Sequence, residues 1–348
     1  MTAPSPRPRS ARQSDVARIA GVSQSAVSRV ISGDAARIPA ETRRRIHDAI
    51  AELGYVPNPV ARNLRGARTR LLGVHTFEPL FPNAREGFYV EFLLGIEQRA
   101  EETGHDLVLF SSTGDGAGGR RIYRDETNRL RIADGSVLLG VSPDRAELAR
   151  LWHEGYPFIH IGRRDVPGAP IPCVIPDYSG AAAGIVERLH GLGHRRLAYL
   201  RDSIDVEPYE DRRAGYADAV TRLGVVDRSP GFVSGTAGVP DEVVSALADG
   251  TCTAAVAESE RVAAELRARL TDRGVRIPED VSVAVLEDTS AADVGWDDLR
   301  IPRQEIGRIA VERLIDMVSD PAAPRESTYV ACEAMPGETV AGVREDRR

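Results

Sequence analysis

The sequence predicts two parts of different fold class: an all-α helix-turn-helix headpiece and, after residue 70, a larger α/β core with parallel sheets. Three short segments between residues 14 and 54 repeat apolar residues at helical spacing, whereas the rest alternates short apolar runs with amphipathic segments. Residues 1–70 hold thirteen Arg against five acidic residues, a net charge of +8, so the other 278 residues carry −15 of the total of −7. A basic head on an acidic body is typical of a nucleic-acid-binding module joined to a separate sensor.

The composition of the 348 residues, 42% of them hydrophobic, is that of a globular protein with two or three domains. No apolar run is long enough to cross a bilayer, and the first residues lack the apolar segment of a secretory signal. We therefore expect a cytoplasmic protein. Cys173, Cys252 and Cys332 are far apart, so we expect reduced packing residues and neither disulfides nor a metal site.

The headpiece is predicted to contain three helices. Ser14 is the expected N-cap of the first helix, Gly21 ends it, and Ser23 caps a second helix that starts almost at once. Gly54 stands where a glycine commonly ends a third helix. Each helix has one apolar stripe, formed by Val16, Ile19 and Ala20, by Val27, Val30 and Ile31, and by Ile46, Ile50 and Leu53.

Burying the second stripe turns a polar face of the second helix outward. Gln24 and Ser25 then lie on the first turn, the part of a recognition helix that reaches base edges, and Arg29 can donate two hydrogen bonds to a guanine. The consecutive residues Arg43–Arg45 suit phosphate groups, which position a protein without reading sequence. The alternative is a three-helix bundle that does not bind DNA.

The motifs D-V-A-x-x-A-G-V-S, V-S-R-V, E-T-R-x-R and L-G-Y-x-P-N follow one another between residues 15 and 58. Over this stretch the chain resembles the headpiece of the lactose-repressor (LacI/GalR) family. The resemblance implies that the start of the second helix and the Arg of V-S-R read bases, whereas Ala26 stands where many members have Thr. The candidate DNA contacts are Ser14, Ser23, Gln24, Ser25, Ser28, Arg29, Asn58 and Leu64.

Residues 58–70 form the expected hinge. Pro57 and Pro59 break the third helix, and the following VARNLR is too short to be a stable helix alone. In the family that the chain resembles, two such segments pack together on DNA and push a Leu from each into the minor groove. Leu64 occupies that position. The alternative for Leu64 is an ordinary linker residue.

The core also resembles that of the LacI/GalR family. The matching motifs are D-Y-S-G-A, GLGHRRLAYL, R-R-A-G-Y and RIPRQEIG. The resemblance implies two parallel-sheet subdomains of the periplasmic-binding-protein type, crossed three times by the chain, with ligand between them. The expected parts are a disordered tail 1–13, the headpiece 14–57, the hinge 58–70 and the core 71–348. Within the core, we expect a first subdomain of about 71–170 and 297–327 and a second of about 171–296 and 328–345.

The effector is expected at the carboxyl ends of the strands, between the subdomains. The resemblance places Arg212 and Asp177 in the cleft, whereas Glu258 and Ser259 stand where the family usually has Asn-Asp. That departure leaves open whether the effector is carbohydrate-like, which we favour, or of another type. The candidate effector contacts are His75, Phe77, Phe88, Asp177, Arg212, Glu258, Ser259 and Glu287.

Two other function classes remain as weaker alternatives. The glycines of Gly114–Gly119 fit G-x-G-x-x-G with Asp134 downstream, which would suit an NAD-dependent dehydrogenase, although a surface loop explains them as well. A solute-binding protein would need an export signal.

His190 and His194 have metal-ligand spacing, but the glycines between them favour a structural role. We expect a regulator that is not an enzyme, has no cofactor, binds a near-palindromic operator, and forms a homodimer or a tetramer.

Overall fold

The computed structural model describes residues 11–31, 35, 38–55, 68–78, 88–111, 119–141, 144–203, 206–228, 238–289 and 294–343. The chain divides into two compact units, Met1–Leu71 (the headpiece) and Leu72–Arg348 (the core). Asn58, Leu64 and Gly114–Gly118 lie outside the described residues, and with them most of the expected hinge. Across the described ranges, no helix combines the length and apolar character that a bilayer span requires.

The headpiece has the three predicted helices, α1 (Gln13–Ala20), α2 (Gln24–Ile31) and α3 (Ala40–Leu53). Gly21 takes a left-handed conformation with φ 62° and ends α1, so that α2 can start after three residues. The helices bury one shared cluster, formed by Val16, Ala17, Ala20, Val27, Val30, Ile46 and Ala49. The helix-turn-helix prediction is confirmed.

Two details of α1 were predicted wrongly. Ser14 is not the N-cap, because the cap lies two residues earlier at Arg12, whose backbone N–H donates to the Asp15 carboxylate at 2.9 Å. Ile19 is 38% exposed, and Ala17 is buried in its place. In so short a helix the buried stripe is narrow, and Val16, Ala17 and Ala20 fill it.

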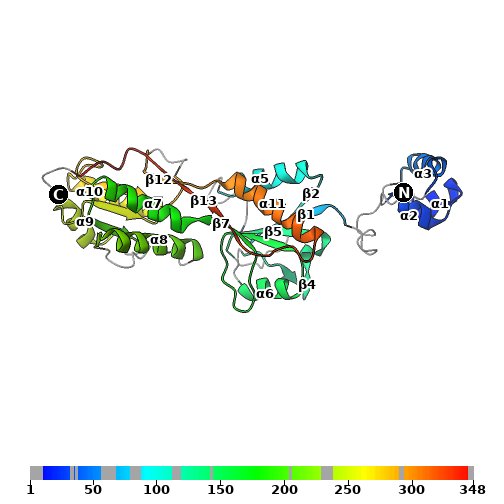
Figure 1. The fold of residues 1–348 in the computed structure, drawn as a ribbon, viewed down its shortest axis with the longest axis horizontal. Helices are drawn as coiled ribbons and strands as arrows, with labels where there is room; N and C mark the ends of the chain where they lie inside the picture. Colours follow the sequence, from blue (N-terminus) through cyan, green and yellow to red (C-terminus); the bar gives the residue numbers. More distant parts are fainter. Residues whose placement is uncertain are drawn as a thin grey trace, which may run out of the picture. The chain divides into compact units, whose positions relative to one another are not determined.

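The first subdomain of the core is built on a six-stranded sheet in the order β13-β7-β6-β5-β1-β2. Helices α5 and α11 cover one face and α6 the other (Figure 1). The strands are β1 (Leu71–Thr76), β2 (Asp106–Phe110), β5 (Gly135–Leu139), β6 (Phe158–Ile161), β7 (Cys173–Asp177) and β13 (Thr328–Ala331), and the helices are α5 (Val90–Glu102), α6 (Arg145–His153) and α11 (Arg303–Ser319). A short hairpin, β3 (Tyr123–Arg124) and β4 (Thr127–Asn128), and the 3-10 helix η1 (Arg129–Ile132) precede β5.

The second subdomain contains a four-stranded parallel sheet in the order β11-β10-β8-β9. Separate apolar clusters cover its two faces, so that Leu197 and Tyr199 of β8 pack on one side and Ala198 and Leu200 on the other. Burial on both faces explains the continuous apolar strands. The elements are β8 (Arg196–Leu200), β9 (Val226–Asp227), β10 (Ala254–Ala257), β11 (Ser282–Val285), α7 (Tyr178–Gly191), α8 (Glu207–Leu223), α9 (Asp241–Ala248) and α10 (Glu260–Asp272).

The borders between the subdomains differ from those expected at residues 171 and 328. Strand β7 pairs with β6 and with β13, so both β7 and β13 belong to the first sheet. The chain therefore enters the second subdomain after Asp177 and again after Ala331. Between the subdomains, β12 (Asp298–Arg300) pairs antiparallel with β14 (Glu333–Met335). An apolar run predicts a buried strand, but it does not indicate which of two neighbouring sheets the strand joins.

Candidate functional site

One face of α2 presents polar side chains to solvent, with Gln24 and Ser25 on the first turn and Arg29 on the last. Gln24, Ser25 and Arg29 are exposed and Ser28 is half-buried, because Val27 and Val30 occupy the buried side of the helix. The Ser23 hydroxyl accepts the backbone N–H of Ala26 at 3.2 Å, so its predicted capping role is confirmed.

Neighbouring side chains restrain this face. The Ser25 hydroxyl lies 2.9 Å from that of Ser23. The Gln24 side-chain amide donates to the Gln13 side-chain oxygen at 3.4 Å, which connects the start of α2 to the start of α1. The first turn of α2 is therefore oriented by contacts within the headpiece.

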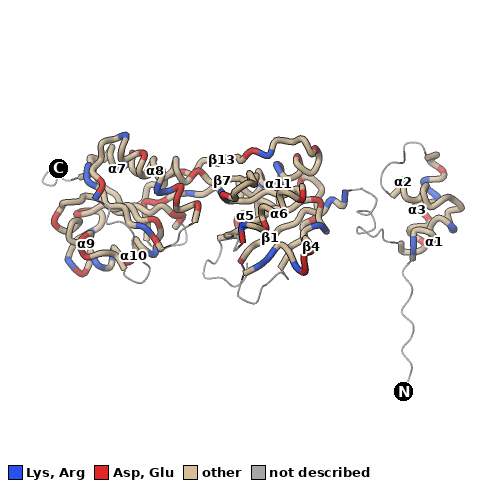
Figure 2. The backbone as a smooth tube through the Cα atoms, turned by 90° about the horizontal axis from the view of Figure 1, so that it is seen from below, with Lys and Arg blue, Asp and Glu red and all other residues tan. Residues whose placement is uncertain are grey.

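Arginines occur on all three helices of the headpiece (Figure 2). Arg43 and Arg44 at the start of α3 are exposed. Arg45 also contacts the headpiece itself, because its guanidinium donates a hydrogen bond to the Ala20 carbonyl at the end of α1. A Cβ on Gly21 would lie 2.7 Å from the Arg45 Nη2, so this contact and the tight turn depend on a glycine there.

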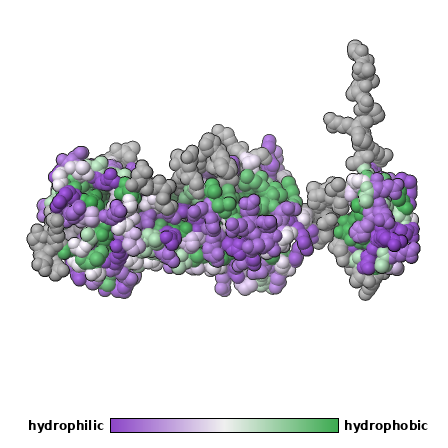
Figure 3. Space-filling view, turned by 90° about the horizontal axis from the view of Figure 1, so that it is seen from above, coloured by the Kyte–Doolittle hydropathy of each residue, from purple (hydrophilic) through white to green (hydrophobic). Residues whose placement is uncertain are grey.

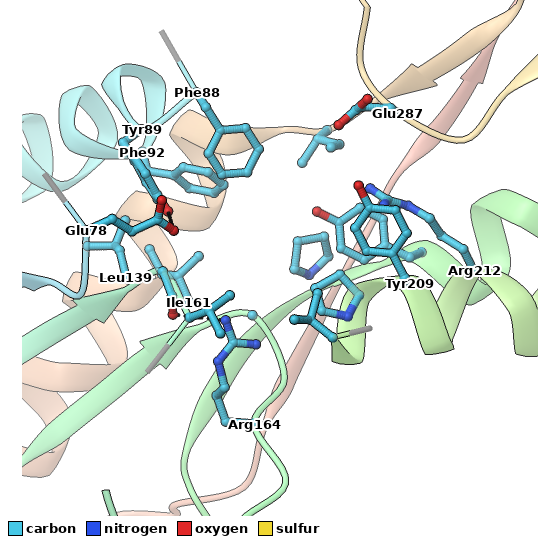
Figure 4. Close-up of a pocket in the computed structure, with 18 residues that line it drawn as sticks. Glu78, Phe88, Tyr89, Phe92, Leu139, Ile161, Arg164, Tyr209, Arg212 and Glu287 are labelled. Carbon is cyan, nitrogen blue, oxygen red and sulfur yellow. Dashed lines mark hydrogen bonds between the residues drawn. The ribbon is translucent and has the colours of Figure 1, made fainter. Parts of the chain in front are cut away.

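The core contains a cavity of about 290 Å³ between its two subdomains (Figure 4). Most of its lining follows the carboxyl ends of parallel strands or begins the helices after them, where α/β proteins bind ligands. The lining residues are Glu78, Phe88, Tyr89, Phe92, Leu139, Gly140, Val141, Ile161, Gly162, Arg164, Pro176, Tyr178, Val206, Pro208, Tyr209, Arg212, Glu287 and Ile301.

Arg212 on α8 is the most unusual charged group of this cavity. Its side chain is 4% exposed, and its Nε has no hydrogen-bond partner among the described residues. The guanidinium carbon lies 4.4 Å from the centre of the Tyr178 ring and 4.7 Å from that of Tyr209. Burial lowers the pKa of Arg212, but Tyr178, Tyr209 and Glu287 outweigh this effect and raise it above its ordinary value. A charged, planar donor thus stays available to a ligand.

A second buried arginine, Arg164, reaches the cavity after β6. It donates to the Gly140 carbonyl at 2.9 Å and pairs with Glu207 of α8 at 3.3 Å, and burial lowers its pKa. Two further pairs cross between the subdomains, Arg145 to Glu207 at 2.9 Å and Arg163 to Asp211 at 2.9 Å. Three ion pairs therefore connect the two subdomains near Arg164.

Two acidic side chains stand among the described lining residues, and both are already hydrogen-bonded within the protein. Glu78 accepts the Tyr89 hydroxyl at 2.7 Å, and Glu287 accepts the backbone N–H of Glu260 at the start of α10 at 3.1 Å. In Figure 4, Glu78 lies beside the α5 residues Tyr89 and Phe92, whereas Glu287 lies near Arg212 on the opposite side.

Of the eight effector contacts expected from the sequence, Phe88, Arg212 and Glu287 line the cavity, and the other five do not. His75 and Phe77 point into the first subdomain, where their rings meet edge to face at 4.8 Å and both are buried. Asp177 accepts the backbone N–H of Gly180 at 2.9 Å as the N-cap of α7.

Glu258 and Ser259 belong to a buried polar network behind the cavity. The Glu258 carboxylate accepts the Tyr199 hydroxyl at 3.0 Å and pairs with Arg213 at 3.3 Å, and burial raises its pKa. Ser259 caps α10 and donates to Asp202 at 2.5 Å. Both side chains are therefore engaged within the second subdomain.

Sequence reasoning did not single out Arg164 or Tyr209 of the lining. Each had a weak signal. Arg164 is the second residue after the apolar run PFIHIG, and Tyr209 stands three residues before Arg212, on the same side of a helix.

Comparison with known proteins covers both units. Residues 14–58 match the family model of bacterial regulatory proteins of the lacI family, and residues 186–340 match that of the periplasmic binding protein-like domain. The chain is 30% identical over 317 residues to the HTH-type transcriptional regulator CelR of Thermobifida fusca, an alignment that covers 87% of this chain and 91% of the relative. This chain belongs to the lacI family.

Other members of the lacI family align over similar lengths. The HTH-type transcriptional regulator AscG of Escherichia coli K12 is 29% identical over 318 residues, with 87% of this chain and 91% of the relative covered. A solved CelR–cellobiose complex is 26% identical in sequence with a TM-score of 0.59, and the alignment covers 94% of this chain and 99% of that structure. The lac repressor dimer bound to operator and the anti-inducer ONPF shares the fold, with a TM-score of 0.68, 23% identity and coverage of 96% and 100%. As a lacI-family member, this protein is a DNA-binding transcriptional regulator, like relatives that are regulators and not enzymes.

Proposed function

We propose that this lacI-family regulator is a repressor that binds a near-palindromic operator as a homodimer, and that a carbohydrate-like effector in the cavity between the core subdomains controls its affinity for DNA. Because the protein acts on DNA, its place of action is the cytoplasm. The observation that carries the proposal is the exposed polar face of α2, with Gln24 and Ser25 on the first turn and Arg29 on the last, held outward by the buried side of the helix.

These three residues have the chemistry of base readers. A Gln amide can bond an adenine edge and an Arg can bond a guanine edge with two hydrogen bonds, whereas Ser accepts several pairings. The exposed Arg43 and Arg44 at the start of α3 supply phosphate contacts.

The first subdomain offers a surface for pairing with a second copy. Strand β2 lies at the edge of the sheet, and its Leu107 and Leu109 are exposed together with Val90 and Leu94 of the neighbouring α5. Figure 3 shows apolar surface on the face of the core where α5 lies. An edge strand beside an apolar helix face favours burial between subunits, and a two-fold dimer matches an inverted repeat. A tetramer remains the alternative.

The cavity supports a small-molecule effector that touches both subdomains. Arg212 offers planar donors from one side, and Arg164 connects the first subdomain to Glu207 of the second. A ligand that binds only when the subdomains are at one spacing shifts their equilibrium, with a coupling free energy of typically about 1–3 kcal/mol. The cellobiose complex of CelR supports a carbohydrate.

The purified full-length protein tests the proposal in a selection from genomic DNA fragments, with and without a panel of sugars. We expect enrichment of one near-palindromic motif, binding that weakens steeply as salt rises, and a change of affinity with one sugar of the panel. Failure to enrich any motif under all conditions would refute operator recognition.

A further inference from the structure

The start of α8 has two sides with different contacts. Four residues of this segment line the cavity, namely Val206, Pro208, Tyr209 and Arg212. Three acids stand among them in the sequence and stay outside the described lining: Glu207, Glu210 and Asp211. Figure 4 shows Tyr209 and Arg212 reaching into the cavity from α8. One short segment thus carries a wall of the ligand cavity on one side and an acidic surface on the other.

Arg163, which follows β6 in the first subdomain, is the centre of the contacts that this acidic surface makes. Its guanidinium lies 2.9 Å from the Glu210 carboxylate and 2.9 Å from that of Asp211. It also donates to the Glu207 carbonyl at 3.4 Å and pairs with the nearby Asp165 of its own loop. Arg163 is therefore bonded to three residues at the start of α8, although it belongs to the other subdomain.

Glu207 makes the buried part of the same connection. It belongs to the second subdomain and is 2% exposed, yet its partners come from the first. Arg145 at the start of α6 lies 2.9 Å from its carboxylate, and Arg164 lies 3.3 Å from it. The backbone N–H of Asp165 also donates to it at 3.3 Å. A buried carboxylate is stable only with such partners, so the surroundings of Glu207 are complete only while the subdomains are close together.

We propose that a charge latch holds the two subdomains of the core closed before any effector binds, formed by Arg145, Arg163, Arg164, Glu207, Glu210 and Asp211. The charges of the latch are segregated, with the three arginines on the first subdomain and the three acids on the second. A single exposed ion pair contributes little to stability, but a network of several pairs around a buried carboxylate contributes more. The attraction between the subdomains therefore comes from this chain alone and needs no ligand.

The charge latch goes beyond the proposed function, because it concerns the protein without a ligand. In a core that is open most of the time, the apparent affinity of a ligand falls in proportion to the closed fraction, because binding must also supply the free energy of closing. A latched core removes that cost. Since the latch and the cavity wall share the start of α8, the latch also holds Tyr209 and Arg212 in place before a ligand arrives.

The test measures the distance between the subdomains in the full-length protein without DNA or sugar, so its outcome is independent of the selection described above. Nitroxide labels are attached at the exposed positions Ala322→Cys in the first subdomain and Ala268→Cys in the second. Cys332→Ser removes the half-buried thiol, whereas Cys173 and Cys252 are buried. With unlabelled protein in excess, pulsed electron paramagnetic resonance reports distances within one chain. We expect one main distance and a longer population below about 10%. Two populations of similar size would overturn the proposal.

Arg163→Glu tests the latch directly, because it places a negative charge beside the carboxylates of Glu210 and Asp211. We expect the longer distance to become the main population, and Arg163→Gln, which removes only the attraction, to give an intermediate distribution. Raising NaCl from about 0.1 M to about 1 M shortens the Debye length from about 10 Å to about 3 Å, and it should return part of Arg163→Glu to the shorter distance. An unchanged distribution in both variants, or an opening that does not respond to salt, contradicts the latch.

Arg150→Glu is the matched control. Arg150 also pairs with two carboxylates, Glu126 at 2.5 Å and Glu154 at 3.1 Å, but all three residues belong to the first subdomain. Its reversal should leave the distance unchanged, and an opening as large as that of Arg163→Glu would mean that charge reversal at any arginine, and not loss of the latch, is the cause. The triple variant Arg163→Glu, Glu210→Arg and Asp211→Arg restores opposite charges across the subdomains and should restore the shorter distance. A triple variant as open as Arg163→Glu would refute the pairing.

Discussion

At the scale of single residues, the proposed function depends on a few polar side chains in different surroundings. Arg29 is exposed on α2, and Arg212 is buried between two aromatic rings, although both are arginines of short motifs. In the proposal, the same side chain serves base recognition where water can reach it and ligand recognition where water cannot. Burial, more than residue type, separates the two roles.

Replacing Arg29 by Ala tests its proposed role as a base reader. We expect the variant to lose about 1–3 kcal/mol of affinity for the selected operator and little for scrambled DNA, because a bidentate guanine contact contributes to specific binding only. Arg44→Ala is the control, since a phosphate contact should weaken binding to both DNAs alike. Unchanged discrimination in Arg29→Ala, measured by fluorescence anisotropy, would contradict the assignment.

His75 predicts a particular dependence of stability on pH. It is fully buried, neither ring nitrogen has a partner among the described residues, and burial followed by the charge of Arg120 lowers its pKa from 6.5 to about 4. Between pH 6.5 and 4 the unfolded state binds more protons at His75 than the folded state does. The free energy of unfolding is therefore unaffected by this group above pH 6.5, and it decreases as the pH drops toward 4. We expect His75→Leu to be neutral or stabilising at pH 7 and to lose less stability at pH 5 than the unmodified protein.

The control for His75 is His160, which is equally buried. Its ring nitrogens lie 2.9 Å from the Gly162 carbonyl and 3.1 Å from the Gly140 carbonyl, next to the cavity. We expect His160→Leu to be destabilising at pH 7, because it removes a buried hydrogen-bond donor. Urea unfolding at both pH values measures the difference, and equal effects of the two substitutions would show that the lack of partners at His75 has no energetic weight.

At the scale of elements, the turn between α1 and α2 is predicted to tolerate a side chain at Gly21 less well than the end of α3 tolerates one at Gly54. Gly21 and Gly54 both have left-handed backbones, with φ 62° and 55°, but a Cβ meets the Arg45 Nη2 at 2.7 Å at Gly21 and nothing within 4 Å at Gly54. We expect Gly54→Ala to cost about 1 kcal/mol, and Gly21→Ala to cost more because Arg45 must also release the Ala20 carbonyl. Hydrogen exchange of α1 and α3 amides measures both, and equal costs would contradict a role for Arg45.

Most elements could be predicted from the sequence because their signals are local. The apolar runs of β8 and β10 and the glycine ends of α1 and α3 depend on neighbours in the chain. The partner sheet of β7 could not be predicted, because its pairing with β13 joins residues about 150 positions apart. Arg212 could be inferred from a motif, whereas the placement of Glu258 behind the cavity depends on Tyr199 and Arg213, which contact it only in the fold.

At the scale of the whole molecule, the pairing surface on α5 and β2 connects the fold to DNA recognition. We expect the double variant Leu94→Asp and Leu109→Asp to sediment as a monomer, because like charges would be buried at the proposed interface. Its operator binding should weaken strongly, since two half-sites are then bound separately. Val226→Asp, which changes an exposed residue of the second subdomain, should remain dimeric. A dimeric double variant would place the interface elsewhere.

The ion pairs across the cavity predict unequal effects of charge removal. Glu207 is 2% exposed and contacts Arg164 and Arg145, whereas Arg163 is partly exposed and pairs with Asp165, Glu210 and Asp211. We expect Glu207→Gln to cost about 3 kcal/mol or more, because Arg164 would remain buried without its carboxylate, and Arg163→Gln to cost less, because water still reaches the carboxylates that it leaves. Thermal melting compares the two, and a larger loss in Arg163→Gln would contradict the greater weight given to the buried pair.

The pairing of β7 with β13 also bears on the order in which the protein matures during synthesis. The sheet of the first subdomain gains its last strand, and α11 its place over that sheet, only after residues 303–331 have been translated. The headpiece is built from local contacts, and its last helix ends at Leu53, about 280 residues before the end of β13. A nascent chain on the ribosome would thus expose a finished headpiece well before its regulatory core could respond to anything, so the synthesis of residues 303–331 determines when control begins.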